Sequence, residues 1–285
     1  MIINFKKKTM KKILKFALSY GIIIGLFACN NDDSLMNTES VLSSNESFTL
    51  TAVYNDVTYT VPCKLENGEI TYLNEEFSDL YNNEISLIQN LATLAYKDDN
   101  GNDVVMYYSS AEELEVKNNI TYFQSQSADA APLTKGTALA GRAILYDDTN
   151  YKDRTVVLDI NSDTYTAIPH LKPSHSFNDK ASSIRIFNLL NPSTHYKPSY
   201  ADWLAPSTSG SNLRVCLIGF EDDSYRGKVL YCVATYSPSA NPNIPETASH
   251  QDWKLANLGW NDKITSVRFR IIAVSDIGKT IHPHN

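Results

Sequence analysis

Two six-residue segments carry the side chains best suited to bind a metal ion. They are Asn178-Asp179-Lys180-Ala181-Ser182-Ser183 and Asn261-Asp262-Lys263-Ile264-Thr265-Ser266. Each offers an amide, a carboxylate, backbone carbonyls and a hydroxyl, which are the hard oxygen ligands that Ca²⁺ prefers. Each also follows an aromatic residue and runs into an alternating strand pattern. The residue types therefore indicate calcium binding at two related loops.

A second motif is repeated ahead of each loop. Tyr146 to Asp153 matches Phe220 to Gly227 position by position: an aromatic residue, four polar residues, a second aromatic residue, one further residue, and then Asp or Gly. The last position suits Gly because the backbone there must take a positive φ, which Asp is among the few other residues to tolerate. The shared order of hairpin and loop predicts two homologous units of four short strands, at 142–190 and 213–272.

Together the two motifs resemble the microbial βγ-crystallin family over residues 141–275. The resemblance implies two Greek keys packed pseudo-symmetrically as a β-sandwich, and two Ca²⁺ ions that each take ligands from both motifs. The expected fold class is therefore mostly β, with a βγ-crystallin-like double Greek-key sandwich that follows a small α+β N-terminal domain.

The resemblance also implies a ligand set for each ion. The residues concerned are Asp179 and Asp262 through side-chain oxygens, Lys180 and Lys263 through backbone carbonyls, and Ser182 and Thr265 through hydroxyls. A carbonyl from the hairpin of the partner motif, near Asp147 or Glu221, and water would complete each site. Asn178 and Asn261 would shape the loops, while Ser183 and Ser266 would close the hairpins by hydrogen bonding.

The first 28 residues are typical of a secretory signal. Six lysines precede a short apolar stretch, Phe16 to Ala28, which is too short for an ordinary membrane span. The ending Leu26-Phe27-Ala28-Cys29 resembles a bacterial lipoprotein signal, in which Cys29 is lipidated. The acidic run that follows is similar to the tether by which Bacteroidota route lipoproteins to the outer cell surface. We therefore expect a lipid-anchored, surface-exposed protein of the outer membrane; secretion without a lipid is the alternative.

The net charge of the chain limits the classes of partner that it can bind. The formal net charge is −7, and cleavage of the lysine-rich leader leaves the mature protein more acidic. Such a surface repels nucleic acid and anionic lipid, so contact with the membrane is expected through the lipid anchor only.

The remaining chain divides by composition. We expect a flexible tether at 29–46, a small α+β domain at 47–122, a polar linker at 123–140 and a tail at 276–285. Within the α+β domain the apolar spacing predicts a helix over 75–90, two hairpins and a short helix that begins at Ser110.

Three cysteines follow Cys29, which leaves an odd number within the mature domains. Cys216 and Cys232 flank one predicted hairpin, so they form either a cross-strand disulfide or two small buried thiols. Neither they nor Cys63 have metal-ligand spacing.

The sequence favours a non-enzymatic role. The histidines are scattered without zinc spacing, and nucleophile-elbow and phosphate-loop motifs are absent. A protease-inhibitor, glycan-binding or host-ligand module on the same fold is the alternative function; its candidate surfaces are Tyr196, Tyr200 and Trp203, and the loop Pro238 to Glu246. An enzyme with an active site between the two domains is a third possibility.

Overall fold

The computed structural model describes residues 46–98, 100–122, 126–127, 139–161, 164–177, 179–190, 213–234 and 250–274. This part of the chain is mostly β, as expected, and lies within one unit, Leu42–Asn285. The expected signal peptide, Cys29, nearly all of the tether, most of the linker and the tail lie outside the described residues. No helix of the described ranges is long and apolar enough to cross a membrane.

The described chain begins with three antiparallel strands, β1 (Glu46–Tyr54), β2 (Val57–Glu66) and β3 (Glu69–Tyr72). Asn55 and Asp56 form the β1–β2 turn with φ of 50° and 62°. Two-residue hairpin turns need positive φ at both positions, and Asn and Asp tolerate it better than most residues. The hairpin predicted here is confirmed.

The first helix is shorter than the sequence predicted. α1 (Glu75–Asn83) is capped by the Asn74 side chain, but the prediction of a helix over 75–90 is wrong beyond Asn83. There the backbone continues as a 3-10 turn, η1 (Ile85–Leu87). Asn favours helix ends because its side chain competes for backbone groups, and Asn83 Nδ2 donates to a carbonyl one turn back at 2.8 Å.

The second predicted hairpin and the second predicted helix are also present. β4 (Ala92–Lys97) pairs with β5 (Asp103–Tyr108), and β5 pairs in parallel with β1. Ser110 Oγ accepts a hydrogen bond from the backbone of α2 (Ala111–Lys117) at 3.2 Å. Two short strands follow, β6 (Thr121–Tyr122) and β7 (Gln126–Ser127).

Within the described ranges each repeat contains four strands, the number that the sequence predicted. The first repeat holds β8 (Gly141–Tyr146), β9 (Thr155–Ile160), β10 (Thr164–Ile168), the short helix α3 (Leu171–His175) and β11 (Ser183–Asn188). The second holds β12 (Leu213–Asp222), β13 (Arg226–Ala234), β14 (His250–Lys254), the 3-10 helix η4 (Leu255–Leu258) and β15 (Ser266–Ala273).

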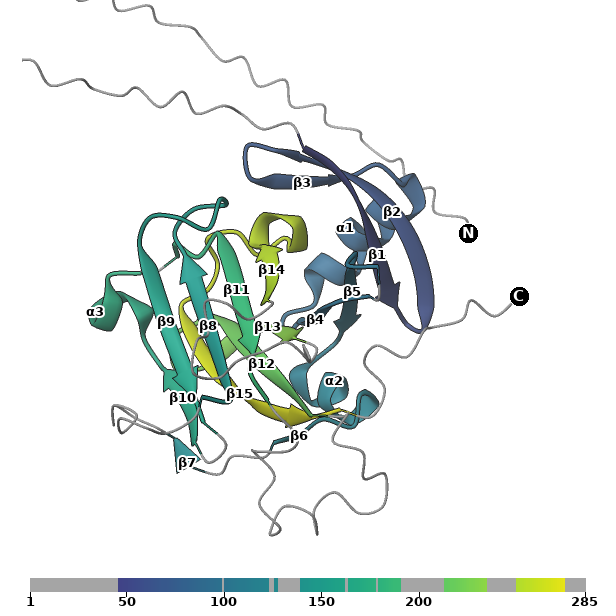
Figure 1. The fold of residues 1–285 in the computed structure, drawn as a ribbon. Helices are drawn as coiled ribbons and strands as arrows, with labels where there is room; N and C mark the ends of the chain where they lie inside the picture. Colours follow the sequence, from purple (N-terminus) through teal and green to yellow (C-terminus); the bar gives the residue numbers. More distant parts are fainter. Residues whose placement is uncertain are drawn as a thin grey trace, which may run out of the picture. The chain divides into compact units, whose positions relative to one another are not determined.

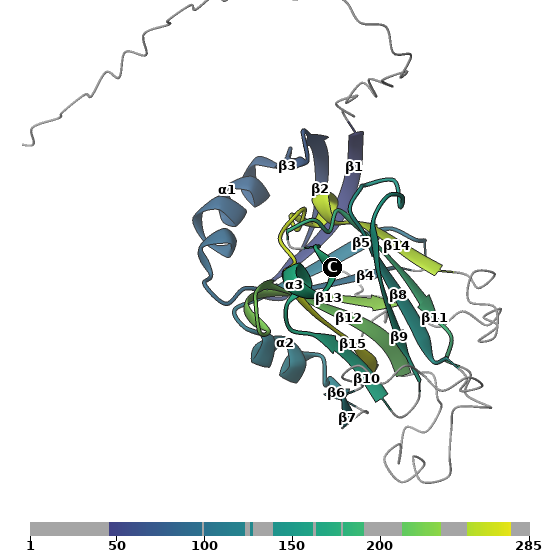
Figure 2. The same cartoon turned by 90° about the vertical axis from the view of Figure 1, so that its left-hand side faces the viewer.

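The two repeats exchange their third strands. One sheet has the order β14-β11-β8-β9, and the other contains the run β13-β12-β15-β10. Thus β14 of the second repeat pairs with β11 of the first, and β10 of the first pairs with β15 of the second. Figures 1 and 2 show the two layers. Because of this exchange, the loops that precede β11 and β15 lie close together.

The N-terminal strands extend the larger sheet. Its full order is β3-β2-β1-β5-β4-β13-β12-β15-β10-β7, with β6 beside β15. The join is a parallel pairing in which Ala92–Ala95 of β4 lie opposite Val229–Cys232 of β13. The sequence predicted one domain at 47–122 and another at 141–275. The linker expected between them lies mostly outside the described residues, and strands of both expected domains belong to this one sheet.

The cysteine alternative is resolved in favour of free thiols. Cys63, Cys216 and Cys232 are free and buried. On the β12–β13 ladder Cys216 lies opposite Val233, and Cys232 lies opposite Leu217. Since successive side chains of a strand point to opposite faces, Cys216 and Cys232 enter different apolar clusters on the two sides of the sheet.

Candidate metal centre

The two oxygen-rich loops have the same backbone shape. Asp179 and Asp262 have left-handed φ of 48° and 54°. The aromatic residues before the loops, Phe177 and Trp260, are buried, and the short helix ahead of each ends in a left-handed residue, Ser176 or Gly259. The sequence duplication is therefore matched by a duplicated conformation.

Each loop is bonded to the helical turn of the other repeat. The Leu171 amide at the start of α3 donates to the carbonyl of Thr265 at 2.9 Å, and the Leu255 amide at the start of η4 donates to the carbonyl of Ser182 at 2.9 Å. The loops also meet directly, because Asp262 N donates to the carbonyl of Ala181 at 3.0 Å. These bonds place the two loops side by side.

Each loop is also tied to its own hairpin. The Ser183 hydroxyl donates to the carbonyl of Asp148 at 2.6 Å, and the Ser266 hydroxyl donates to that of Asp222 at 2.7 Å. Both serines are fully buried. The expectation that they close the hairpins by hydrogen bonding is confirmed.

Two close oxygen pairs involve the expected ligands. The Ser182 hydroxyl donates to Asp262 Oδ1 at 3.1 Å, and the Thr265 hydroxyl donates to the carbonyl of Glu221 at 2.9 Å. The first pair crosses between repeats, whereas the second lies within one.

The hairpin carbonyl expected from the partner motif stays a prediction. In the structure the Thr265 hydroxyl meets the carbonyl of Glu221, which belongs to its own repeat. The reason is that the fourth strand of a repeat pairs directly beside its first, β15 with β12 and β11 with β8. Of these two oxygen pairs, the one between Ser182 and the Asp262 carboxylate joins the two repeats.

The other predicted residues lie around these pairs. Asp179 is exposed as a residue, but partial desolvation of its carboxyl raises the pKa. Lys172 opposes this shift and Asp223 and Asp262 add to it, so that the pKa of Asp179 is raised overall. The Lys263 ammonium donates to the carbonyl of Gly259 at 2.7 Å, so the ammonium is held against the backbone of its own loop.

The remaining predicted residues are placed less directly. Lys180 is half-buried. The Asp147 carboxylate pairs with Arg154 at 2.7 Å, and its backbone carbonyl remains the expected ligand. Asn178 lies outside the described residues. Asn261 Nδ2 donates to Asp262 Oδ2 at 2.9 Å, and Asn261 Oδ1 is buried without a hydrogen-bond partner in the described part of the chain.

The donor set suits Ca²⁺ better than a transition metal. Every group involved is an oxygen, and within the described ranges no three His, Cys, Asp or Glu side chains gather in a way that could hold a metal. Two oxygens 2.9–3.1 Å apart that bind one ion at about 2.45 Å would subtend about 75° at the ion, close to the roughly 72° of a pentagonal bipyramid. The oxygen donors are therefore of the chemical type that Ca²⁺ prefers.

Two arginines support the hairpins, a role that the strand patterns at 184–187 and 267–270 did not predict. The guanidinium of Arg185 lies 5.0 Å from the ring centre of Tyr151, and that of Arg268 lies 4.0 Å from the ring centre of Tyr225. Both stack on the second aromatic residue of a hairpin, which supports the hairpin beside its loop. Their matching places two residues after each loop were a usable signal.

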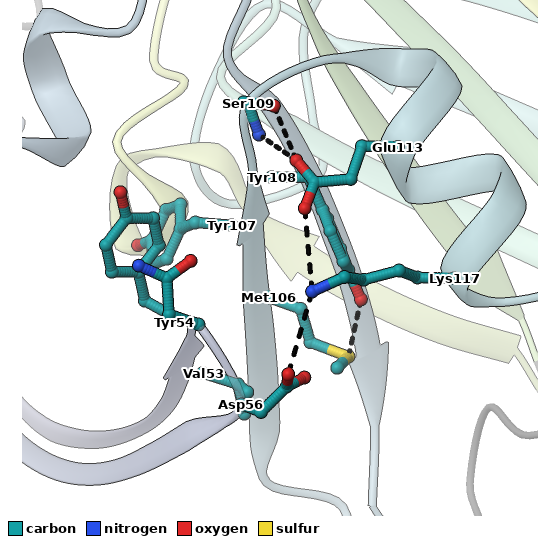
Figure 3. Close-up of a pocket in the computed structure, with 10 residues that line it drawn as sticks. Val53, Tyr54, Asp56, Met106, Tyr107, Tyr108, Ser109, Glu113 and Lys117 are labelled. Carbon is teal, nitrogen blue, oxygen red and sulfur yellow. Dashed lines mark hydrogen bonds and ion pairs between the residues drawn. The ribbon is translucent and has the colours of Figure 1, made fainter.

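A pocket lies apart from the loops, between β1, β5 and α2 (Figure 3). Its volume is about 40 Å³, whereas ligand pockets typically have about 300–1,000 Å³. Lys117 Nζ lies there 3.7 Å from Asp56 and 3.5 Å from Glu113. The pocket has room for water rather than for a small-molecule substrate. The candidate glycan residues Tyr196, Tyr200 and Trp203, and the loop Pro238 to Glu246, lie outside the described residues.

No family model matches the chain, and no curated protein matches it. One solved structure, described as "Evolution of the eye lens beta-gamma-crystallin domain fold", is similar over 51% of this chain and 96% of its own, with 14% sequence identity and a TM-score of 0.26. A likeness at this TM-score carries no conclusion about function.

Proposed function

We propose that the protein binds two Ca²⁺ ions in a double Greek-key domain of the βγ-crystallin type, and that the ions stabilise the folded chain without catalysis. The contact between Ser182 and Asp262 across 3.1 Å carries the proposal, because it brings a hydroxyl and a carboxylate together from the two repeats. An ion bound there would join the repeats through both oxygens.

The charge at the loops bounds the affinity. With roughly one carboxylate for each ion, the dissociation constants should fall between those of sensors, about 10⁻⁷ to 10⁻⁵ M, and those of extracellular modules, about 10⁻⁴ to 10⁻³ M. A ligand that binds only the folded state stabilises it by mass action, by about 2.7 kcal/mol at a concentration one hundred times the dissociation constant.

Calorimetric titration of Ca²⁺ into the full-length protein, purified in detergent and stripped of metal, tests the proposal. We expect heat from two ions for each chain and a melting temperature that rises with Ca²⁺. Mg²⁺ should do neither at the same concentration, because it demands a smaller octahedral site. Absence of both the heat and the rise would refute the proposal.

We also propose that a lipid on Cys29 anchors the protein at the surface of the outer membrane. The support is the leader ending Leu26-Phe27-Ala28-Cys29 and the acidic run after it. Metabolic labelling with a fatty acid should mark the parent protein and leave Cys29→Ala unlabelled. Labelling of both proteins, or of neither, would contradict the anchor.

A further inference from the structure

The turn between β2 and β3 lies against the second calcium loop. Gly68 in this turn has φ of +80°, and a β-carbon placed on it would lie 3.4 Å from Asn261 Nδ2. Asn261 belongs to the loop 261–266, almost 200 positions further along the chain. A β-carbon there would be in van der Waals contact with the Asn261 amide, so the further atoms of a longer side chain would compete with that amide for space.

Asn261 connects this turn to the proposed ligands. Its Nδ2 donates to Asp262 Oδ2 at 2.9 Å, while Asp262 Oδ1 accepts from Ser182 at 3.1 Å. The Asp262 carboxylate thus accepts from the Asn261 amide through Oδ2 and from the Ser182 hydroxyl of the other repeat through Oδ1. A displacement of Asn261 would reach the Asp262 carboxylate through a single hydrogen bond.

The rest of the N-terminal segment holds the turn in place. β3 packs against η4, the 3-10 helix just ahead of the loop, and both views draw them as neighbours (Figures 1 and 2). A β-carbon placed on Gly259 would lie 3.6 Å from the Tyr81 hydroxyl of α1. Glu46 at the start of β1 pairs with Lys254 Nζ at 2.6 Å.

The same segment shares a core with the second repeat. Tyr72 and Phe77 belong to one apolar cluster with Leu255, Leu258 and Trp260. The same cluster also includes Leu171 and Phe177 of the first repeat, where Ser176 accepts a hydrogen bond from Arg154 and His170 lies 3.4 Å from Asp223. Both loops therefore rest on this core, and the second loop is the one whose Asn261 faces the turn at Gly68.

We propose that the N-terminal segment 46–122 regulates the calcium site formed by Asp262 and Ser182, with Gly68 and Asn261 as positioning residues. This inference rests on the proposed calcium binding. The turn at Asn67-Gly68 holds Asn261, which orients the Asp262 carboxylate toward Ser182. Because energetic coupling between two sites is reciprocal, calcium at that site tightens the turn to the same degree that the turn strengthens calcium binding.

Two glycine variants form a matched test. Gly68 and Gly101 have φ of +80° and +82°, but a β-carbon at Gly101 would meet nothing within 4 Å. Asn tolerates such a φ, so Gly68→Asn and Gly101→Asn impose the same backbone demand and differ in their neighbours. In calorimetric titration of the full-length protein we expect Gly68→Asn to bind one of its two ions about five- to tenfold more weakly, and Gly101→Asn to match the parent.

The outcomes separate the inference from the calcium proposal. If the parent binds two ions and both variants titrate like it, the regulation is refuted and calcium binding stands. If the parent binds no calcium, the regulation and the calcium proposal are both refuted.

If Gly68→Asn does not fold, hydrogen exchange on the parent protein tests the inference instead. Saturating Ca²⁺ should slow amide exchange in the turn 66–69 several-fold more than in the turn 98–103. Equal effects at the two turns would refute the inference.

Discussion

The Ser182 hydroxyl donates a hydrogen bond to the Asp262 carboxylate across 3.1 Å, although 80 residues separate them along the chain. The contact exists because the repeats exchange their third strands, which brings the loops before β11 and β15 together. The neighbouring bond from Asp262 N to the carbonyl of Ala181 fixes the loop backbones at the same point.

Asp179 should oppose folding when calcium is absent. Burial raises its pKa, and the nearby Asp223 and Asp262 raise it further against the opposing effect of Lys172. A carboxyl whose pKa is higher in the folded state contributes stability at low pH and loses it as the pH rises through the folded pKa. Asp179→Asn should therefore raise the melting temperature of the calcium-free protein at neutral pH, and should not do so below the ordinary Asp pKa of about 3.9.

Thermal unfolding in a chelator at the two pH values checks this, with the exposed Asp79→Asn in α1 as the control. The same Asp179→Asn variant should show a smaller rise of melting temperature on addition of Ca²⁺. A loss of stability at neutral pH without calcium would contradict the account.

The Ser266 hydroxyl should stabilise the folded protein whether or not calcium is bound. This hydroxyl is fully buried, donates to the carbonyl of Asp222 at 2.7 Å and accepts from the Tyr225 amide at 3.1 Å. Ser266→Ala removes both hydrogen bonds of this buried hydroxyl, and a typical intramolecular hydrogen bond contributes about 0.5–1.5 kcal/mol to stability. Urea unfolding should give that loss both in a chelator and in Ca²⁺, whereas the exposed Ser47→Ala should change stability by no more than about 0.5 kcal/mol. A loss confined to one condition would refute a purely structural role.

Gly227 should tolerate substitution less well than a glycine of the same backbone conformation. Its φ is +76°, and a β-carbon would lie 2.8 Å from Asp222 Oδ2. Gly101 has φ of +82° and open space. Gly101→Ala should therefore lose only the φ term, about 1 kcal/mol, and Gly227→Ala should lose this term plus the smaller cost of turning the exposed Asp222 side chain aside, as measured by urea unfolding. Equal losses would show that the steric contact is without effect.

The cysteines should be unreactive in the folded protein. Burial raises the pKa of Cys63 to about 11 and raises the pKa values of Cys216 and Cys232. Because the thiolate is the nucleophile, iodoacetamide at neutral pH should label the three thiols only after denaturation. Mass spectrometry of the non-reduced protein should find no link between Cys216 and Cys232; a disulfide there would contradict the strand register.

The strands of both repeats could be predicted from sequence because their signals are local. Alternation and turn residues mark each strand, and the left-handed residue that closes the hairpin was expected at Asp153 and Gly227, where φ is 64° and 76°. The end of α1 was missed because apolar spacing continues through Ile85 while the backbone does not.

Long-range pairings left weaker signals. The parallel contact of β4 with β13 joins segments far apart in sequence, and its only hint was the continuous apolar run of β4, which is typical of a strand buried on both faces. The family resemblance predicted that each ion takes ligands from both motifs, but it did not single out the contact of the Asp262 carboxylate with Ser182. The approach of Gly68 to Asn261 had no signal in the sequence, because it depends on how β3 packs.

The central claim is that one calcium ion is shared between the repeats through Ser182 and Asp262. Calorimetric titration of the parent, Ser182→Ala, Asp262→Asn and the double variant tests it most directly, because residues that bind one ion are not additive. We predict two ions for the parent, loss or strong weakening of one ion in each single variant, and no further loss in the double variant. Additive losses in the double variant, or two unchanged ions in Asp262→Asn, would contradict the account.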